Sequence, residues 1–332
     1  MKRSVLIFLL TLTPLLLSAL DCAVCGKRIH GNYIKSGNTA YCTKRCLLST
    51  MPTCAGCGRK CERQVISMMT KKFCSRECMY KTFRCYTCGQ GADNMIGMYS
   101  SGGKQVLICP QCSKRPKCYF CTMPCDRKPP LRDGRRICQT CRKTAVTDHN
   151  QIRRVYQEVR RNMGIWFGFD TRHKIELIIV PVRELEKRSN AIYQPDGGRR
   201  LALMNYEQEV TEKRYYNGKK QRYISKERCR IYILDSIPLV MLYDTLAHEL
   251  THDHLRHNLG KVKVLADEEG FCELMASIYN EKTGNAGINK LKEEKKDPVY
   301  GGGYRRMRSI YLRNGRNWKQ AFRSIRAGRK EF

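Results

Sequence analysis

The pattern of apolar and polar positions divides the chain into two parts that differ in kind. In the C-terminal part, the apolar run Ile231–Leu234 predicts a buried strand. From Leu239 to Leu250, leucines recur every three or four residues, which predicts a helix over residues 238–257 with one buried stripe. The polar pair Asp235-Ser236 precedes this helix, and we expect it to provide the cap. This part of the chain therefore predicts a globular domain with a core.

The N-terminal part is rich in cysteine and poor in large apolar residues. Of twenty cysteines in the chain, eighteen lie between Cys22 and Cys141. Such a region cannot be held by an apolar core and requires metal ions or disulfides. Thr43 and Ser75 each follow an aromatic residue and a cysteine, and we expect them to cap short helices. The change in composition predicts a domain boundary near residue 145.

These cysteines form four consecutive sets, each made of two pairs with two or three residues between the partners. Two such pairs bind one tetrahedral Zn²⁺, and a closed four-thiolate site is structural rather than catalytic. The predicted ligand sets are Cys22, Cys25, Cys42 and Cys46; Cys54, Cys57, Cys74 and Cys78; Cys85, Cys88, Cys109 and Cys112; and Cys118, Cys121, Cys138 and Cys141. A disulfide scaffold is the competing interpretation. Cys61 and Cys125 are left over, as alternative ligands or free thiols.

The predicted helix carries the sequence His-Glu-Leu-Thr-His at residues 248–252. Two histidines four residues apart lie on one side of a helix, so His248 and His252 can hold one Zn²⁺ beside an open coordination position. Glu249 is then placed to act as a general base on a zinc-bound water. A polar helix face is the simpler alternative, but four of the seven histidines fall within residues 248–257. The pattern favours a catalytic zinc site.

A third zinc ligand is expected from a later helix, and an acidic run supplies it. Sixteen residues separate His252 from Glu269, and twenty separate it from Glu273. We choose Glu269, then Glu273, then Glu268. Asp267 is expected to cap this helix or to orient a zinc-bound imidazole. The polar residues nearby that are candidates for stabilising an oxyanion are His254, His257 and Tyr279.

Several of these motifs resemble the plant LIM-domain peptidases that limit organ growth and are activated by ubiquitin. The resemblance spans roughly residues 150–325, and its motifs are Ile237-Pro238-Leu239, Leu246 through His252, Leu255-Arg256, Glu268 through Cys272, and Asp297 through Arg305. It implies a gluzincin-type peptidase in which His248, His252 and a glutamate bind the metal and Glu249 is the catalytic acid/base. The modules depart from LIM domains, because every expected ligand is cysteine and five to seven residues separate the modules. Fold and chemistry are carried over from this resemblance, and the ubiquitin switch is not.

The N-terminus and the net charge bear on location and partners. A charged start, an apolar stretch and the small residues Ser18-Ala19 predict a signal peptide over residues 1–19, and hence a secreted or periplasmic protein without a membrane span after cleavage. The formal net charge is +33. Ten Lys and Arg fall within residues 305–332, where nucleic acid or an anionic surface would bind. The apolar positions in that segment favour the solvated face of a helix instead.

These observations predict an α+β protein in three parts. Residues 1–19 form the signal peptide, residues 20–145 form four small zinc-ribbon or treble-clef-like (LIM-like) modules, and residues 146–332 form a zincin-like metallopeptidase domain. The modules are predicted at residues 22–46, 54–78, 85–112 and 118–141. One catalytic and about four structural Zn²⁺ are expected. The expected function is zinc-dependent hydrolysis of a protein or peptide substrate, with modules that bind a partner or the substrate. The alternative is a non-enzymatic zinc-module adaptor that binds a protein or an anionic polymer through its basic surface.

Overall fold

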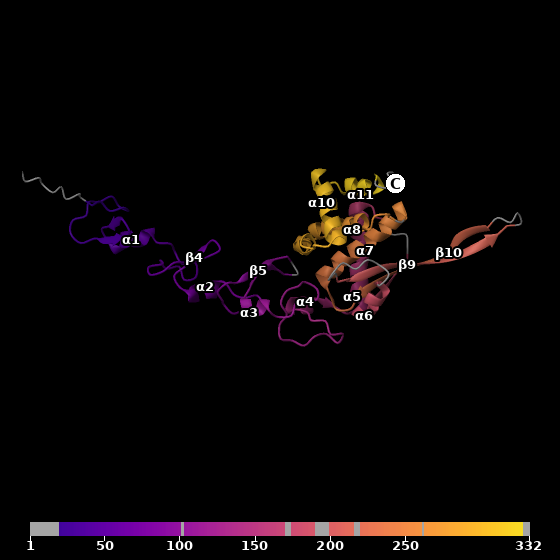
Figure 1. The fold of residues 1–332 in the computed structure, drawn as a ribbon, viewed down its shortest axis with the longest axis horizontal. Helices are drawn as coiled ribbons and strands as arrows, with labels where there is room; N and C mark the ends of the chain where they lie inside the picture. Colours follow the sequence, from indigo (N-terminus) through magenta and orange to yellow (C-terminus); the bar gives the residue numbers. More distant parts are fainter. Residues whose placement is uncertain are drawn as a thin grey trace, which may run out of the picture. The chain divides into compact units, whose positions relative to one another are not determined.

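The computed structural model describes residues 20–100, 103–169, 174–189, 199–215, 220–260 and 262–327. The predicted signal peptide, residues 1–19, lies outside these ranges. Helices and short sheets together make an α+β protein (Figure 1). None of the helices in these ranges has the length and apolar character needed to cross a membrane. Contacts between residues divide the chain into two compact units, one ending at Arg84 and one beginning at Cys85.

The first unit contains two modules of the same construction. Each module continues from a cysteine-pair turn through a two-stranded antiparallel hairpin into a helix of two turns. Thr43 and Ser75 are the N-caps of these helices and accept hydrogen bonds from the backbone N–H groups of Cys46 and Cys78, which confirms the predicted caps. The elements are β1 (Ile34–Ser36), β2 (Thr39–Tyr41), α1 (Lys44–Thr50), β3 (Ile66–Met68), β4 (Lys71–Phe73) and α2 (Arg76–Thr82).

The second unit contains the other two modules and a mixed α+β body. A three-stranded sheet has the order β8-β10-β9, with β8 parallel and β9 antiparallel to the central strand. The helices α7 and α8 pack against each other beside this sheet. The strands are β5 (Ile96–Tyr99), β6 (Gln105–Ile108), β7 (Ala145–Val146), β8 (Ile175–Val180), β9 (Ala202–Arg214), β10 (Lys220–Leu234) and β11 (Ile237–Pro238). The helices are α3 (Pro110–Ser113), α4 (Gln139–Lys143), α5 (His149–Phe167), α6 (Val182–Ser189), α7 (Leu239–Leu259), α8 (Leu265–Lys282), α9 (Asn289–Glu293), α10 (Gly303–Arg313) and α11 (Trp318–Ala327), with a 3₁₀ turn η1 (Ala286–Ile288) and a π-helical turn η2 (Pro298–Gly302).

The third and fourth modules pack against the body of the second unit. Strand β7, directly after the fourth module, pairs with β11. The buried Arg135 of that module donates to the backbone oxygen of Asp235 at 2.9 Å, and the N–H of Leu239 donates to the oxygen of Thr144 at 2.8 Å. Contacts therefore divide the chain sixty residues before the predicted boundary near 145. The change in composition marks the last residue of the cysteine-rich segment. The contacts differ because the third and fourth modules pack against the C-terminal elements and so belong to the second unit.

The segment before α7 differs from its prediction. The run Ile231–Leu234 is the end of the fifteen-residue strand β10, and the helix then begins at Leu239. Its N-cap is Pro238, which makes no side-chain capping bond. The pair Asp235-Ser236 instead forms a turn, with Ser236 at a φ of 57°. The predicted cap is wrong because β11 intervenes to pair with β7 before the helix starts.

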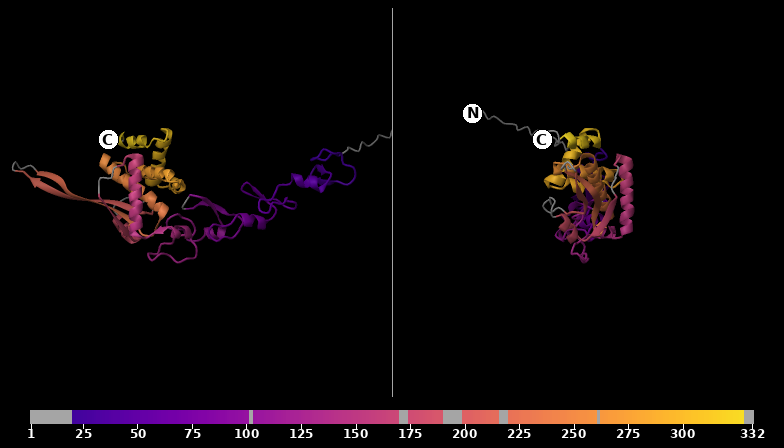
Figure 2. Two further views of the ribbon diagram at one scale, coloured as in Figure 1. Left: turned by 180° about the vertical axis from the view of Figure 1, so that it is seen from behind. Right: turned by 90° about the vertical axis from the view of Figure 1, so that its right-hand side faces the viewer.

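Strands β9 and β10 continue as a ribbon beyond the rest of the sheet. Strand β8 pairs only with residues Cys229–Leu234 of β10, whereas β9 pairs with β10 along most of its length. The outer part of this hairpin is therefore two-stranded and extends away from the body of the second unit in the left view of Figure 2. The inner part of β9 lies against α7, and this contact positions the candidate site.

Candidate metal centres

The sixteen predicted cysteine ligands lie in four clusters, one in each module. The sulfurs of each cluster lie within 4.8 Å of one another, and seven neighbouring Sγ–Sγ pairs lie 3.5–3.9 Å apart. Zn–S bonds of about 2.3 Å place thiolates about 3.8 Å apart in a tetrahedron, whereas a disulfide requires about 2.05 Å. All twenty cysteines are free. The clusters therefore fit zinc modules and not the disulfide scaffold.

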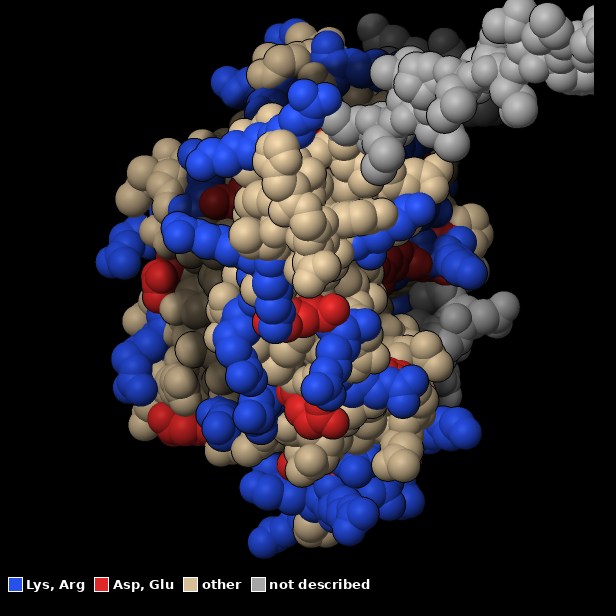
Figure 3. Space-filling view, turned by 90° about the vertical axis from the view of Figure 1, so that its left-hand side faces the viewer, with Lys and Arg blue, Asp and Glu red and all other residues tan. Residues whose placement is uncertain are grey.

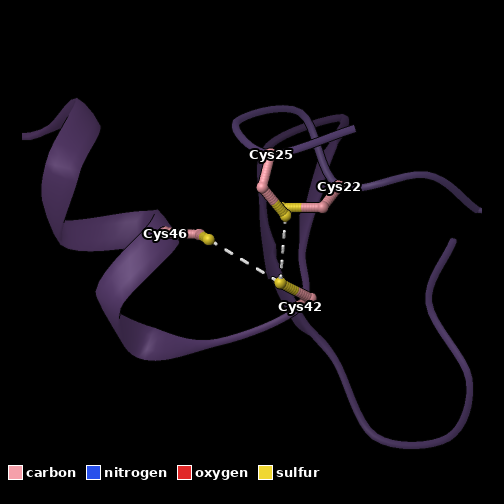
Figure 4. Close-up of side chains that lie close together, drawn as sticks. All are labelled: Cys22, Cys25, Cys42 and Cys46. Carbon is pink, nitrogen blue, oxygen red and sulfur yellow. Dashed lines mark hydrogen bonds between the residues drawn. The ribbon is translucent and has the colours of Figure 1, made fainter. Parts of the chain in front are cut away.

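The first module shows how one cluster is assembled. Cys22 and Cys25 come from the turn, Cys42 from the end of the hairpin and Cys46 from the first turn of α1, and their sulfurs converge (Figure 4). Gly26 follows the turn at a φ of 69°, a conformation that glycine adopts without strain. Backbone N–H groups around the turn lower the pKa of Cys22 to about 6, which favours the thiolate that zinc requires.

The two leftover module cysteines have a packing role. Cys61 is 3% exposed and lies in a small core with Phe73 and Met79, and Cys125 is equally buried beneath the fourth cluster. Each stands seven residues after the first cysteine of its module, a position occupied by Ile29 in the first module. Burial raises the pKa of both thiols. They are therefore small apolar groups beneath the metal turns, outside the four clusters.

A second kind of cluster lies between α7 and α8. Nε2 of His248 lies 3.2 Å from Nε2 of His252 and 3.1 Å from a carboxylate oxygen of Glu269. The same oxygen lies 3.5 Å from Nε2 of His252. Ligand atoms 2.0–2.2 Å from a tetrahedral Zn²⁺ are about 3.3–3.6 Å apart, so these three atoms have the spacing of ligands to one metal ion. Burial alone would raise the pKa of Glu269, but the charge of His252 and hydrogen bonds from both imidazoles hold it well below 4.5.

The other acidic residues of α8 have different partners. Glu268 contacts the other ring nitrogen of His252, with Oε1 3.1 Å from Nδ1. Glu273, the second choice for a ligand, is paired with Lys292 and Lys295. Asp267 pairs with Arg306 and does not orient an imidazole. Among the three candidate ligands from this helix, the structure brings Glu269 to both histidines.

Glu249 is held by the edge strand of the sheet. Its side chain is buried between α7 and β9, and the backbone N–H of Met204 donates to Oε2 at 2.9 Å. The residue follows His248 directly on α7, and its carboxylate is not one of the three converging ligand atoms. A main-chain donor fixes the orientation of this carboxylate, as a general base requires.

Tyr300 reaches the same region from the C-terminal segment. Burial and the negative charge of Glu269 raise the pKa of Tyr300. The charge of Glu249 also raises this pKa, whereas the charge of His252 lowers it. The guanidinium of Arg200 donates to the Tyr300 hydroxyl at 3.3 Å. The protonated phenol is a hydrogen-bond donor on which the charges of Glu269, Glu249 and His252 act.

A close crossing of two helices brings η2, and with it Tyr300, to the site. Gly270 on α8 faces Gly303 at the start of α10, and a Cβ on either would clash with the backbone of the other helix. Gly270 follows the ligand Glu269 directly. Only glycine at both positions allows the two helices to approach this closely. The glycine in the Glu-Gly-Phe run and the last glycine of the run after Tyr300 therefore hold η2 next to α8.

The three residues proposed for oxyanion stabilisation lie elsewhere. His254 stacks on Phe169, with ring centroids 3.8 Å apart and an interplanar angle of 6°. It is two residues from His252 and therefore on the opposite side of α7. Tyr279 lies on α8 ten residues after Glu269, which is about 15 Å along the helix. Its hydroxyl accepts a hydrogen bond from Asn162. His257 is exposed in the last turn of α7.

The two remaining cysteines are both buried near this centre. Cys272 is fully buried, and its sulfur lies within 4.8 Å of a ring nitrogen of His248 and of His252. Burial raises its pKa to about 12, which keeps the thiol protonated. Cys229 donates to the sulfur of Met204 at 3.3 Å. Sequence reasoning assigned neither residue a role. It named Glu268 only as the third choice of ligand, not as the partner of His252, and it gave no role to Met204 or Tyr300, whose contacts join separate elements.

Comparisons with known proteins agree with part of this description. Residues 198–296, which contain β9, β10, α7 and α8, match the family model described as DA1-like, Protein DA1. Protein DA1-related 2 of Arabidopsis thaliana is 27% identical over 168 residues, which cover 46% of this chain and 31% of that protein. The chain thus spans about a third of the length of the curated relative it matches. These matches support the resemblance to that plant family, and the four-cysteine clusters fit its zinc-module character.

Proposed function

We propose that this protein is a zinc-dependent peptidase with a zincin-like domain. The supporting observation is the convergence of His248, His252 and Glu269 at 3.1–3.5 Å. Glu249, the next residue after His248, is buried and held by the backbone N–H of Met204. Two imidazoles and one carboxylate are the protein ligands of a thermolysin-type zinc site, which keeps a position for water. Secretion is part of the proposal and depends on the predicted signal peptide alone. The four-cysteine modules would bind the substrate or a partner protein.

Each residue of the centre has a chemical task in this proposal. Zinc bound there would lower the pKa of a water molecule and polarise the scissile carbonyl. Glu249 would accept a proton from a water molecule and pass it to the leaving amine. Tyr300, supported by Arg200, donates a hydrogen bond to the oxygen that becomes negative during attack. Glu268 orients the imidazole of His252 through its Nδ1.

The decisive experiment is hydrolysis of a peptide library by the parent protein and by Glu249→Gln. This change keeps the shape of the side chain and the bond from Met204 but removes the base, so we expect activity to fall by about 10²–10⁴-fold or more. Zinc content should stay the same because Glu249 is not a ligand. Glu294→Gln, at an exposed position of the same unit, is the matched control and should retain activity.

Tyr300→Phe is the companion variant in the same assay. It should lower kcat, because the hydrogen bond it removes forms with charge that develops in the transition state. Parental turnover by Glu249→Gln would refute the proposed active site. Parental turnover by Tyr300→Phe would refute only the role of the tyrosine.

A second candidate function is supported by the charge of the first unit. Residues 20–84 contain thirteen Lys and Arg against three Asp and Glu, and all but Lys60 of these basic residues are exposed. Figure 3 shows Lys and Arg predominating over Asp and Glu on the face that it draws. An adaptor that binds an anionic polymer would use this surface. It predicts binding that falls with salt and is unchanged in Glu249→Gln, with no cleavage by either protein.

A further inference from the structure

A buried lysine joins the two helices that carry the candidate metal ligands. Lys292, on α9, is 4% exposed. Its Nζ lies 2.6 Å from Oδ1 of Asp244 on α7 and 2.7 Å from Oε2 of Glu273 on α8. Burial alone would lower the pKa of Lys292, but these two carboxylates raise it. The ammonium is therefore charged, and a buried charge of this kind persists only with such partners.

Each of the two carboxylates that pair with Lys292 lies one helical turn from a candidate metal ligand on the same helix. Asp244 precedes His248 by four residues on α7, and Glu273 follows Glu269 by four residues on α8. Residues four apart lie on the same face of a helix, one turn along its axis. Lys292 therefore bridges α7 and α8 one turn away from the point where His248 and Glu269 meet at 3.1 Å.

Other polar contacts hold this bridge in place. The Nζ of Lys295 lies 2.7 Å from Oε1 of Glu273, so both oxygens of that carboxylate are paired. The side-chain amide of Asn280 donates to Asp244 at 2.6 Å and to Asn289 at 3.0 Å. The bridge is thus a connected network from α7 through α9 to α8.

We propose that Lys292 is a positioning residue that sets the distance between α7 and α8 at the metal centre, and thereby the affinity of His248, His252 and Glu269 for zinc. The inference depends on the proposed function only in taking these three residues as ligands. Without the ammonium, the buried carboxylate of Glu273 and the half-buried carboxylate of Asp244 face each other across the helix interface, and their repulsion separates the helices. A wider interface no longer holds the ligand atoms at tetrahedral spacing.

The test measures metal binding by full-length protein and needs no substrate. Zinc affinity is obtained by competition with a chelator, and the coordination geometry by the visible spectrum of protein with Co²⁺ at this centre. For Lys292→Met we expect a loss of about tenfold or more in affinity, as for other residues that support metal ligands, and a changed cobalt spectrum. The zinc of the four-cysteine modules should be retained. Lys290→Met is the matched control, because Lys290 pairs with Glu293 on the exposed side of the same helix.

Two further variants keep the proposal testable if Lys292→Met fails to fold. Asp244→Asn leaves the pair between Lys292 and Glu273 intact, and we expect it to fold with several-fold weaker zinc binding. The combined variant Asp244→Asn, Glu273→Gln and Lys292→Met contains no buried charge at the bridge and should regain affinity relative to Lys292→Met.

Two outcomes separate the two proposals. Folded Lys292→Met or Asp244→Asn with parental zinc affinity and cobalt spectrum overturns the positioning role, even if thermal stability falls. Weakened zinc binding in these variants together with full turnover by Glu249→Gln supports the positioning role and refutes the peptidase mechanism instead.

Discussion

Replacing Glu268 by Gln tests how the metal centre is supported. In the structure this residue makes the contact to an imidazole that was expected from the sequence as one of two roles for Asp267. Oε1 of Glu268 lies 3.1 Å from Nδ1 of His252, and its side chain is 26% exposed. Gln can still accept from the imidazole, so the change exchanges a charged hydrogen bond for a neutral one. Charged hydrogen bonds contribute about 1.5–3 kcal/mol and neutral ones about 0.5–1.5 kcal/mol. The midpoints of these ranges differ by about 1.25 kcal/mol. Partial exposure lowers this difference to about 1 kcal/mol, which is about fivefold in affinity for zinc.

Chelator competition at neutral pH measures this affinity, with the four-cysteine sites as internal reference. Asp267→Asn is the matched control, since it also removes one carboxylate from the first turn of α8 but acts on Arg306. It should leave zinc binding unchanged. If Asp267→Asn weakened zinc binding as much as Glu268→Gln, or if Glu268→Gln had no effect, the assignment of Glu268 as the partner of His252 would be refuted.

Three other predictions concern metal content, domain structure and pH. Native mass spectrometry of mature protein should find about five zinc ions per chain, and about one would contradict the four module sites. A fragment of residues 85–332 should unfold cooperatively, whereas residues 146–332 should be less stable or insoluble, because the third and fourth modules cover part of the same core. Equal stability of the two fragments would contradict this packing. Burial would raise the pKa of Glu273, but Lys292 and Lys295 depress it, so its contribution to stability is present above about pH 4.5 and lost as pH falls further. The difference in unfolding free energy between parent and Glu273→Gln should shrink below that pH, and a constant difference would contradict the shift.

Features encoded within a few residues of sequence were predictable. The caps Thr43 and Ser75, the strand at Ile231–Leu234 and the helix that begins at Leu239 each follow from local spacing and residue type. The cysteine sets are also local patterns, because the spacing within a pair is itself the requirement of a metal turn.

Features that depend on contacts between distant elements were not predictable. Met204 is an apolar residue in a strand, and only its backbone N–H matters to Glu249. Tyr300 lies near the centre because α8 and α10 approach each other closely at Gly270 and Gly303. Nothing in the sequence indicates that these two glycines are in contact. Glu273 could be excluded as a ligand only once Lys292 and Lys295 were seen beside it. Proximity across elements therefore had to come from the structure.

The bond from Met204 to Glu249 makes the candidate base depend on strand register rather than on residue identity. Because the donor is a main-chain N–H, every substitution at this position except proline preserves it. A one-residue slip of β9 against β10 would instead place a neighbouring residue opposite Glu249, and the N–H of that residue would point toward β10 rather than toward the carboxylate. The pairing shifts between Ile224 and Lys226, so the ribbon already contains an irregularity on the side of the hairpin loop. Insertions beyond that irregularity can be absorbed there, whereas an insertion between it and Ile231, the partner of Met204, would move the amide away from the carboxylate.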